Sequence, residues 1–102
     1  TLKERRKVAE TGVVFSILVR KRSTGKIIGE PEIISRGLLE ESFHPELFDK
    51  AREVMIAILE DADEASKERS IDVQELIRVG LRRFFYSKLG KKPVVVPVIV
   101  DV

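Results

Sequence analysis

Few side chains in this 102-residue chain could take part in catalysis. The sequence has one histidine, His44, and no cysteine, which excludes disulfides, thiol catalysis and cysteine-ligated metals. One histidine cannot build a dinuclear centre or a histidine-based zinc site. Because Pro45 suits the first helical position, we interpret His44 as a helix-start residue. Three serines lack a histidine at a spacing that would activate them, so we predict no hydrolytic catalysis by this segment. These serines are Ser16, Ser35 and Ser66.

An acidic group formed by Asp61, Asp63 and Glu64 could suggest a divalent-metal site. In a helix, positions 61 and 63 point in different directions, and no glycine-turned loop accompanies them. We interpret the group as a solvated acidic face and predict neither a metal site nor a cofactor in this segment.

Basic residues are a stronger functional lead than these groups. The RNA-contact candidates are Arg78, Arg82, Arg83, Lys88, Lys91 and Lys92 near the end of the chain, and Arg20, Lys21 and Arg22 near its beginning. Tyr86 lies among the later ones, so phosphate contacts and base stacking could occur together. A solubilising charged face is the alternative, and no RNP-type, KH-type or helix-turn-helix signature indicates base-specific recognition.

Charge is segregated along the chain although the formal net charge is only +2. Residues 1–26 carry a net +6, residues 27–77 carry −9, and residues 78–102 carry +5. If the two ends of the chain meet in space, this segregation indicates one acidic and one basic face.

Composition indicates one globular domain, with 43% hydrophobic and 35% charged residues. The longest apolar run, Pro93–Val100, is too short to span a bilayer as a helix, so we expect no membrane partner. The charged opening does not resemble a secretory signal. A cytoplasmic location is therefore expected.

Five predicted helices and strands determine where these side chains lie. Residues 13–19 are rich in β-branched side chains and predict a strand. Residues 20–26 predict a turn with Gly25 at positive φ, and residues 27–28 begin an antiparallel return strand. Pro31 then suits an edge or bulge position, so this strand should bend before Gly37 ends it.

Two helices follow a loop predicted at residues 38–44. The apolar stripe of the first comprises Leu47, Phe48, Ala51, Val54, Met55, Ile58, Leu59 and Ala62. The second begins with Asp72 as N-cap and Glu75 three residues later, with Ile71 in a hydrophobic staple. Its stripe comprises Val73, Leu76, Ile77, Gly80, Leu81, Phe84 and Phe85, and Gly90 closes it. Gly80 predicts close approach to another backbone.

Residues 94–102 predict a last strand, and Pro97 within it favours an edge or bulge. The order β-β-α-α-β defines an α+β fold: a three-stranded mixed sheet with two helices packed on one face. We expect the last strand beside the first, because two helices form a permissible crossover. Strands 13–19 and 94–102 are apolar on both alternations, so the uncovered face predicts self-association.

Four stretches together resemble a known family. They are Gly12-Val13-Val14, Thr24-Gly25-Lys26, Ile33-Ile34-Ser35-Arg36-Gly37 and the ending Lys92-Pro93-Val94-Val95-Val96-Pro97-Val98-Ile99-Val100. The chain resembles the C-terminal domain of ribonuclease J, with residues 1–11 as the end of an inter-domain linker and residues 12–102 as the domain.

The resemblance implies a parent enzyme with metallo-β-lactamase and β-CASP domains that acts on RNA as a dinuclear zinc endo- and 5′-to-3′ exoribonuclease. The zinc ligands of that family lie outside this segment. The resemblance implies a non-catalytic accessory domain that supports homo-oligomer formation, with the catalytic domains of the same chain as a further partner. Ser35 and Arg36 are compatible with a structural role or with contact to the catalytic part.

A free-standing small RNA-binding or protein-interaction domain is the alternative hypothesis.

The turn residues Arg20, Lys21 and Arg22 could extend an RNA-binding surface on the second helix. The sequence leaves open which end of that helix they approach.

Overall fold

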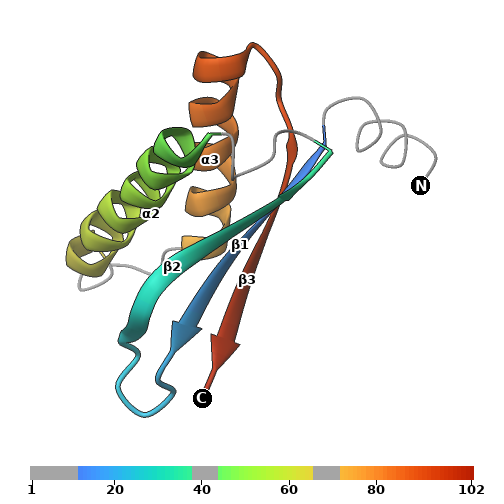
Figure 1. Cartoon of the computed structure of the whole chain (residues 1–102). Helices are drawn as coiled ribbons and strands as arrows, with labels where there is room; N and C mark the ends of the chain where they lie inside the picture. The colour runs from blue at the N-terminus through green and yellow to red at the C-terminus, as the bar shows by residue number, and fades with distance from the viewer. Residues whose placement is uncertain (1–11, 38–43, 66–71) are drawn as a thin grey trace.

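The computed structural model describes residues 12–37, 44–65 and 72–102, with side chains through residue 62 in the first helix (Figure 1). Its elements are β1 (Val13–Arg20), β2 (Ile27–Arg36), α2 (Pro45–Ala65), α3 (Val73–Leu89) and β3 (Val94–Asp101). This is the predicted β-β-α-α-β order of an α+β fold. Predictions for the linker at 1–11, the loop at 38–43, Ser66, Ile71 and the side chains of Asp63 and Glu64 lie outside the described residues.

The sheet has the strand order β2-β1-β3, so β1 is central. β2 pairs with β1 antiparallel, and β3 pairs with β1 parallel, which confirms the predicted mixed sheet. The chain between β2 and β3 contains both helices, and Figure 1 shows α2 and α3 on the same side of the sheet. The opposite side of the sheet is not covered by the described part of the chain.

The predicted bend in β2 is a bulge within a continuous strand. Ile17 pairs with Glu32 and Val19 pairs with Ile28, so two steps along β1 correspond to four along β2. Gly29 has φ +71° there, a conformation that a Cβ atom disfavours. The extra residues therefore lie around Pro31, as the sequence predicts.

Pro97 lies on an edge strand, one of the two positions that the sequence predicts for it. The N–H of Val94 donates to Gly12 and that of Val102 donates to Arg20, and the register between them is uninterrupted. By alternation, the even-numbered residues of β3 bond to β1, and Pro97 faces the free edge. The missing N–H of Pro97 therefore costs the sheet no hydrogen bond.

The hydrophobic core lies between the helices and the covered face of the sheet. Its buried members are Val14, Leu18, Ile33 and Val95 from the sheet, Phe48, Ala51 and Met55 from α2, and Ile77, Leu81 and Phe85 from α3. The rings of Phe48 and Phe85 are 6.0 Å apart and tilted by 55°, which joins the two helices above the sheet. Aromatic pairs in this geometry add to the stabilisation from burial.

The ends of α3 agree with the predicted caps. The Asp72 carboxylate accepts a hydrogen bond from the N–H of Glu75 at 3.2 Å. Gly90 has φ +70°, and its N–H donates to the carbonyl of Tyr86 at 2.8 Å. In a capping box the Glu75 side chain would also bond back to the N–H of Asp72. Here the Glu75 carboxylate accepts from Arg78 instead.

Two predictions for the α3 stripe are wrong. Leu76 is 42% exposed, because it lies about 100° around the helix from the buried Ile77 and points away from the sheet. Gly80 is closely approached, but by a side chain: a Cβ atom there would overlap Cδ1 of Ile58 on α2. The helix contact at Gly80 therefore depends on a flexible side chain and not on a neighbouring backbone.

Candidate functional site

The uncovered side of the sheet, which we call the open face, is mostly aliphatic. Register and alternation place on it Val13, Phe15, Ile17 and Val19 of β1, Ile28, Glu32, Ile34 and Arg36 of β2, and Val94, Val96, Val98 and Val100 of β3. Exposed fractions reach 46% at Ile28 and 43% at Val100. Contiguous exposed apolar surface of this kind is typical of a binding site.

On the central strand β1, the covered side is less uniformly apolar than the open side. Ser16 lies on the covered face between its register partners Ile33 and Pro97. It is 1% exposed, and its hydroxyl has no hydrogen-bond partner among the described residues. A two-layer sheet normally alternates apolar residues inward with polar residues outward. This sheet does not, so its open face is poorly suited to permanent contact with water.

Each edge of the sheet carries a proline. On β3, Pro97 occupies a position whose backbone faces away from β1, so the free edge lacks one donor. On β2, Pro31 lies in the bulge beside Gly29. Prolines and bulges at edges oppose the addition of another strand. Of the surfaces that the sheet offers, the open face is therefore better suited to docking than the edges.

The basic residue candidates fall into two separate groups. Arg20, Lys21 and Arg22 lie where β1 ends, and Arg20 lines a hollow together with Asp72, which begins α3. The other candidates lie on α3 and beyond its end, up to about 25 Å away along a helix of 17 residues. The turn residues thus approach the N-terminal end of α3, and the described part of the chain has no single basic face that joins both groups.

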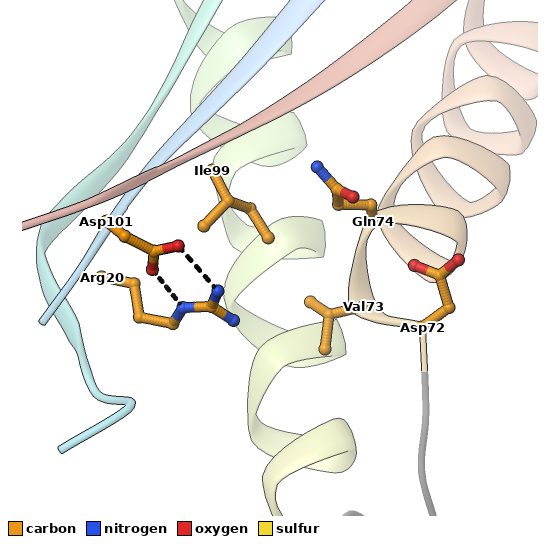
Figure 2. Close-up of a pocket in the computed structure, with 6 residues that line it drawn as sticks. All are labelled: Arg20, Asp72, Val73, Gln74, Ile99 and Asp101. Carbon is orange, nitrogen blue, oxygen red and sulfur yellow. Dashed lines mark hydrogen bonds and ion pairs between the residues drawn. The ribbon is translucent and has the colours of Figure 1, made fainter. Parts of the chain in front are cut away.

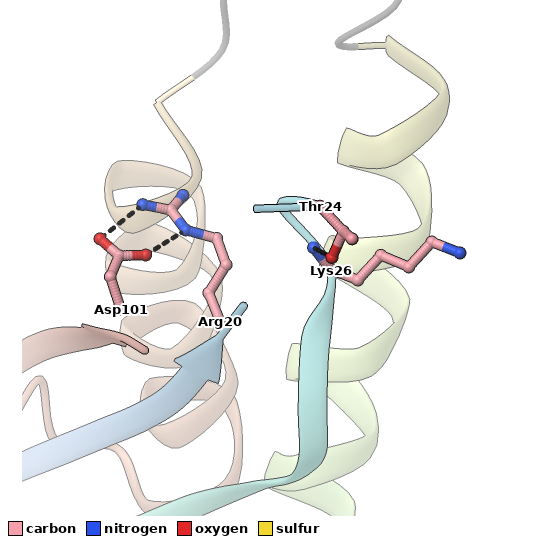
Figure 3. A network of polar contacts seen from close by, with 4 residues as sticks. All are labelled: Arg20, Thr24, Lys26 and Asp101. Atoms are coloured by element: carbon pink, nitrogen blue, oxygen red, sulfur yellow. Dashed lines mark hydrogen bonds and ion pairs between the residues drawn. The ribbon is translucent and has the colours of Figure 1, made fainter. Parts of the chain in front are cut away.

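Arg20 already has a partner within the domain. Its Nε and Nη2 donate to the two carboxylate oxygens of Asp101 at 2.7 and 3.1 Å (Figure 3). The hydrogen bond from Arg20 holds the pKa of Asp101 below its usual range, and the same bond raises the pKa of Arg20. Figure 3 also shows the adjoining hairpin turn, where Thr24 Oγ1 accepts from the N–H of Lys26 at 3.3 Å. The Arg20–Asp101 pair links the C-terminal end of β1 to the C-terminal end of β3.

The second basic group includes one cation that contacts an exposed aromatic ring. Tyr86 is 51% exposed, and Nζ of Lys92 lies 4.8 Å from the centre of its ring. Arg82 and Arg83 are three or four residues before Tyr86 and share its side of the helix. Lys88 and Lys91 are exposed nearby in sequence. We call Arg82, Arg83, Tyr86, Lys88, Lys91 and Lys92 the α3 basic cluster.

Arg78 does not join this cluster as a free cation. Its guanidinium donates through Nε to Glu75 at 2.9 Å and also through Nη2 to the same carboxylate. The bond from Arg78 lowers the pKa of Glu75, and the bond to Glu75 raises the pKa of Arg78. Its charge is therefore partly neutralised by Glu75.

A hollow of about 340 Å³ lies between the end of the sheet and the first turn of α3 (Figure 2). Its lining residues are Arg20, Asp72, Val73, Gln74, Ile99 and Asp101. The charged groups in it already serve the fold, since Asp72 caps α3 and Arg20 bonds to Asp101. We assign no ligand to this hollow.

The remaining candidates lie in structural positions. His44 is exposed before α2, and its carbonyl accepts from the N–H of Phe48 at 3.4 Å, as expected of a helix-start residue. Within the described ranges, no group of three or more histidine, cysteine, aspartate or glutamate residues is placed to hold a metal ion. The helices in those ranges also contain no stretch that is long and apolar enough to cross a membrane.

The motif at the end of β2 contributes to both faces of the sheet. Ile33 is 2% exposed in the core, whereas Ile34 is 37% exposed on the open face. Ser35 pairs in register with Val14, and its carbonyl accepts from Nη1 of Arg36 at 2.9 Å. Gly37 follows with φ +73°. The sequence could identify this motif, but the orientation of Arg36 depends on the register of β2.

The fold defines a small two-layer α+β domain with one aliphatic sheet face open. The model of the family described as the ribonuclease J C-terminal domain matches residues 1–102, and the chain belongs to this family. It is 27% identical to Ribonuclease J2 of Bacillus subtilis (strain 168) over 101 residues, which make up 99% of this chain and 18% of that protein.

A second relative supports the same assignment. The chain is 29% identical to Ribonuclease J 1 of Streptococcus pyogenes serotype M3 over 99 residues, which make up 96% of this chain and 18% of that protein. The chain thus spans 18% of the length of each of these two relatives.

Proposed function

We propose that this chain is the non-catalytic accessory domain of a ribonuclease J-like enzyme that acts in RNA processing and decay in the cytoplasm. Its membership of the ribonuclease J C-terminal domain family supports this role. The proposed zinc-dependent endo- and 5′-to-3′ exoribonuclease centre belongs to the catalytic domains of the parent enzyme. Those domains are proposed partners of this chain, and RNA reaches it as the substrate of the parent.

The accessory role that we propose is support of oligomer formation through the open face. The observation that carries it is the row of exposed aliphatic side chains across three strands, among them Ile28, Val96, Val98 and Val100. Three strands of about eight residues present a face on the order of 350 Å². A standard interface buries about 800 Å² on each partner. Association of this chain alone should therefore be weak, and other contacts should add to it in the whole enzyme.

Sedimentation equilibrium over a concentration series tests this role on the 102-residue chain, which has its own hydrophobic core. The expected result is a reversible shift from monomer to dimer as the concentration rises. A sample that stays monomeric to millimolar concentration would remove the support for assembly through this chain.

We propose RNA phosphate contacts as a second contribution, made by the α3 basic cluster. The contact of Lys92 with the exposed ring of Tyr86 supports it, because a cation and a stacking surface are presented together. Arg20 and Arg78 should contribute less, since each is already bonded to a carboxylate. Binding that depends on phosphates should be tolerant of sequence and sensitive to salt.

A further inference from the structure

The charged residues of the open face are placed symmetrically. In register, Arg36 lies opposite Val13 and Glu32 lies opposite Ile17, so each is two residues from Ile34 on the same strand. Both side chains are exposed, and their charges are opposite. Among the paired strand positions of this face, every other residue is aliphatic or aromatic. A partner for this face must therefore offer an apolar surface and two charges, each opposite in sign to the charge that it meets and at the same spacing.

A second copy of the same chain meets this requirement. We infer that two copies pack their open faces together about a two-fold axis that crosses the strands at the row of Phe15, Ile34 and Val96. This inference rests on the proposed role in oligomer formation and specifies its geometry. Glu32 and Arg36 lie at equal distances on opposite sides of the axis. Each Glu32 therefore meets Arg36 of the second copy, and the contact occurs twice.

The direction of the axis follows from the two charges. An axis parallel to the strands would place β2 over β3 of the second copy and would set Glu32 against aliphatic rows. An unpaired buried charge is costly, so that arrangement is disfavoured. An axis across the strands instead places β2 over its own counterpart, antiparallel, with Glu32 and Arg36 paired. Packed sheets lie about 10 Å apart, a gap that these two long side chains can bridge from opposite sides.

Arg36 retains the capacity for this contact. Its Nη1 donates to the carbonyl of Ser35 at 2.9 Å. A guanidinium has five N–H donors, so others remain for a carboxylate of the second copy. The edges of the sheet offer no equivalent route, because Pro97 and Pro31 oppose strand addition there.

A mixing experiment with Glu32→Lys and Arg36→Glu tests the geometry. In a dimer of either variant alone, both contacts join like charges. In a dimer of one variant with the other, both contacts join opposite charges again. We expect each variant alone to dimerise with a dissociation constant roughly tenfold higher than that of the parent chain. An equimolar mixture should return to within about threefold of the parent value. Sedimentation equilibrium measures all four samples.

The matched control is Glu60→Lys, which reverses an exposed charge on α2 and should leave dimerisation unchanged. Circular dichroism checks that each variant is folded. If the mixture associates no better than the single variants, the axis is wrong, and the assembly role still stands as long as the parent chain dimerises. If the parent stays monomeric throughout, both the geometry and the assembly role are overturned, and the catalytic domains become the expected cover for the open face.

Discussion

The open face of the sheet and the outer surface of the helices are both exposed, yet their chemistry is opposite. Strand residues such as Val96 and Val98 are each 36% exposed on the open face without a charge beside them on their own strand. The helices expose charges at most outward positions, acidic on α2 and basic at the end of α3. Water hydrates the charges on such a helix surface favourably, whereas contact of water with an aliphatic sheet face is unfavourable. The comparison therefore assigns apolar docking to the sheet and electrostatic contact to α3.

The largest expected effect is a difference in stability between substitutions on the two faces of β1. Leu18, on the covered face, is 1% exposed, whereas Ile17 next to it lies on the open face. Leu18→Ala should lower the free energy of unfolding by about 2–5 kcal/mol, because it leaves a cavity in the core. Ile17→Ala should cost less in dilute solution, where the chain is monomeric. Urea unfolding of both variants measures the difference, and equal losses would show that the open face is buried within the monomer.

The next effect concerns association. Val98→Asp should raise the dissociation constant of the dimer at least about a hundredfold, because it buries an unpaired carboxylate at a cost of several kcal/mol. The matched control is Leu76→Asp, since Leu76 is 42% exposed on α3 and an acid near a helix N-terminus is tolerated. Sedimentation equilibrium should show loss of dimer for the first variant only. A similar loss for both would place the interface on the helices.

RNA binding tests the helix side of the comparison. Replacing Arg82, Arg83 and Lys91 by Gln should weaken single-stranded RNA binding and reduce the slope of log K against log salt by about 2, since each phosphate contact contributes roughly 0.7. Lys50→Gln, which removes an exposed cation from acidic α2, is the control. Fluorescence anisotropy at several salt concentrations measures the slope. If the triple variant binds RNA like the parent at every salt concentration, the α3 basic cluster is only a solvated surface.

The smallest effect is the acid response of the Arg20–Asp101 pair. The pKa of Asp101 is lowered in the folded state, so the pair contributes stability above the ordinary pKa of about 3.9 and loses it as the pH falls through the lowered value. Asp101→Asn should be slightly less stable at pH 7 and should lose less stability on acidification. Denaturation at pH 7 and below pH 3 compares the two chains. Identical losses would mean that solvent screens the pair completely.

The sequence predicts the element order and both caps of α3, because these depend on local patterns. It predicts the mixed sheet because two helices between strands form a permissible crossover. Residues 13–19 and 94–102 are apolar on both alternations, and with helices on only one face of the sheet this pattern predicts self-association. Self-association stays a prediction. The apolar stripe of α3 misplaces Leu76, because a stripe that includes two adjacent positions, 76 and 77, does not show which one points inward.

Other features depend on the register of the strands. The bulge around Gly29 fixes which residues of β1 lie beside Glu32 and Arg36, and residue types alone do not set its length. The separation of the two basic groups depends on the direction of α3 relative to β1, which local sequence patterns do not specify.

The most direct test of the central claim is an isotope-filtered NOE experiment on a mixture of ¹³C-labelled and unlabelled chain at a concentration where dimer forms. The open-face geometry predicts intermolecular NOEs between the ring of Phe15 and methyl groups of the same row on the second copy, including Ile34 and Val96. It predicts none at Leu76 or Tyr86 on α3. Intermolecular NOEs confined to the helices would contradict the assignment of the open face as the interface.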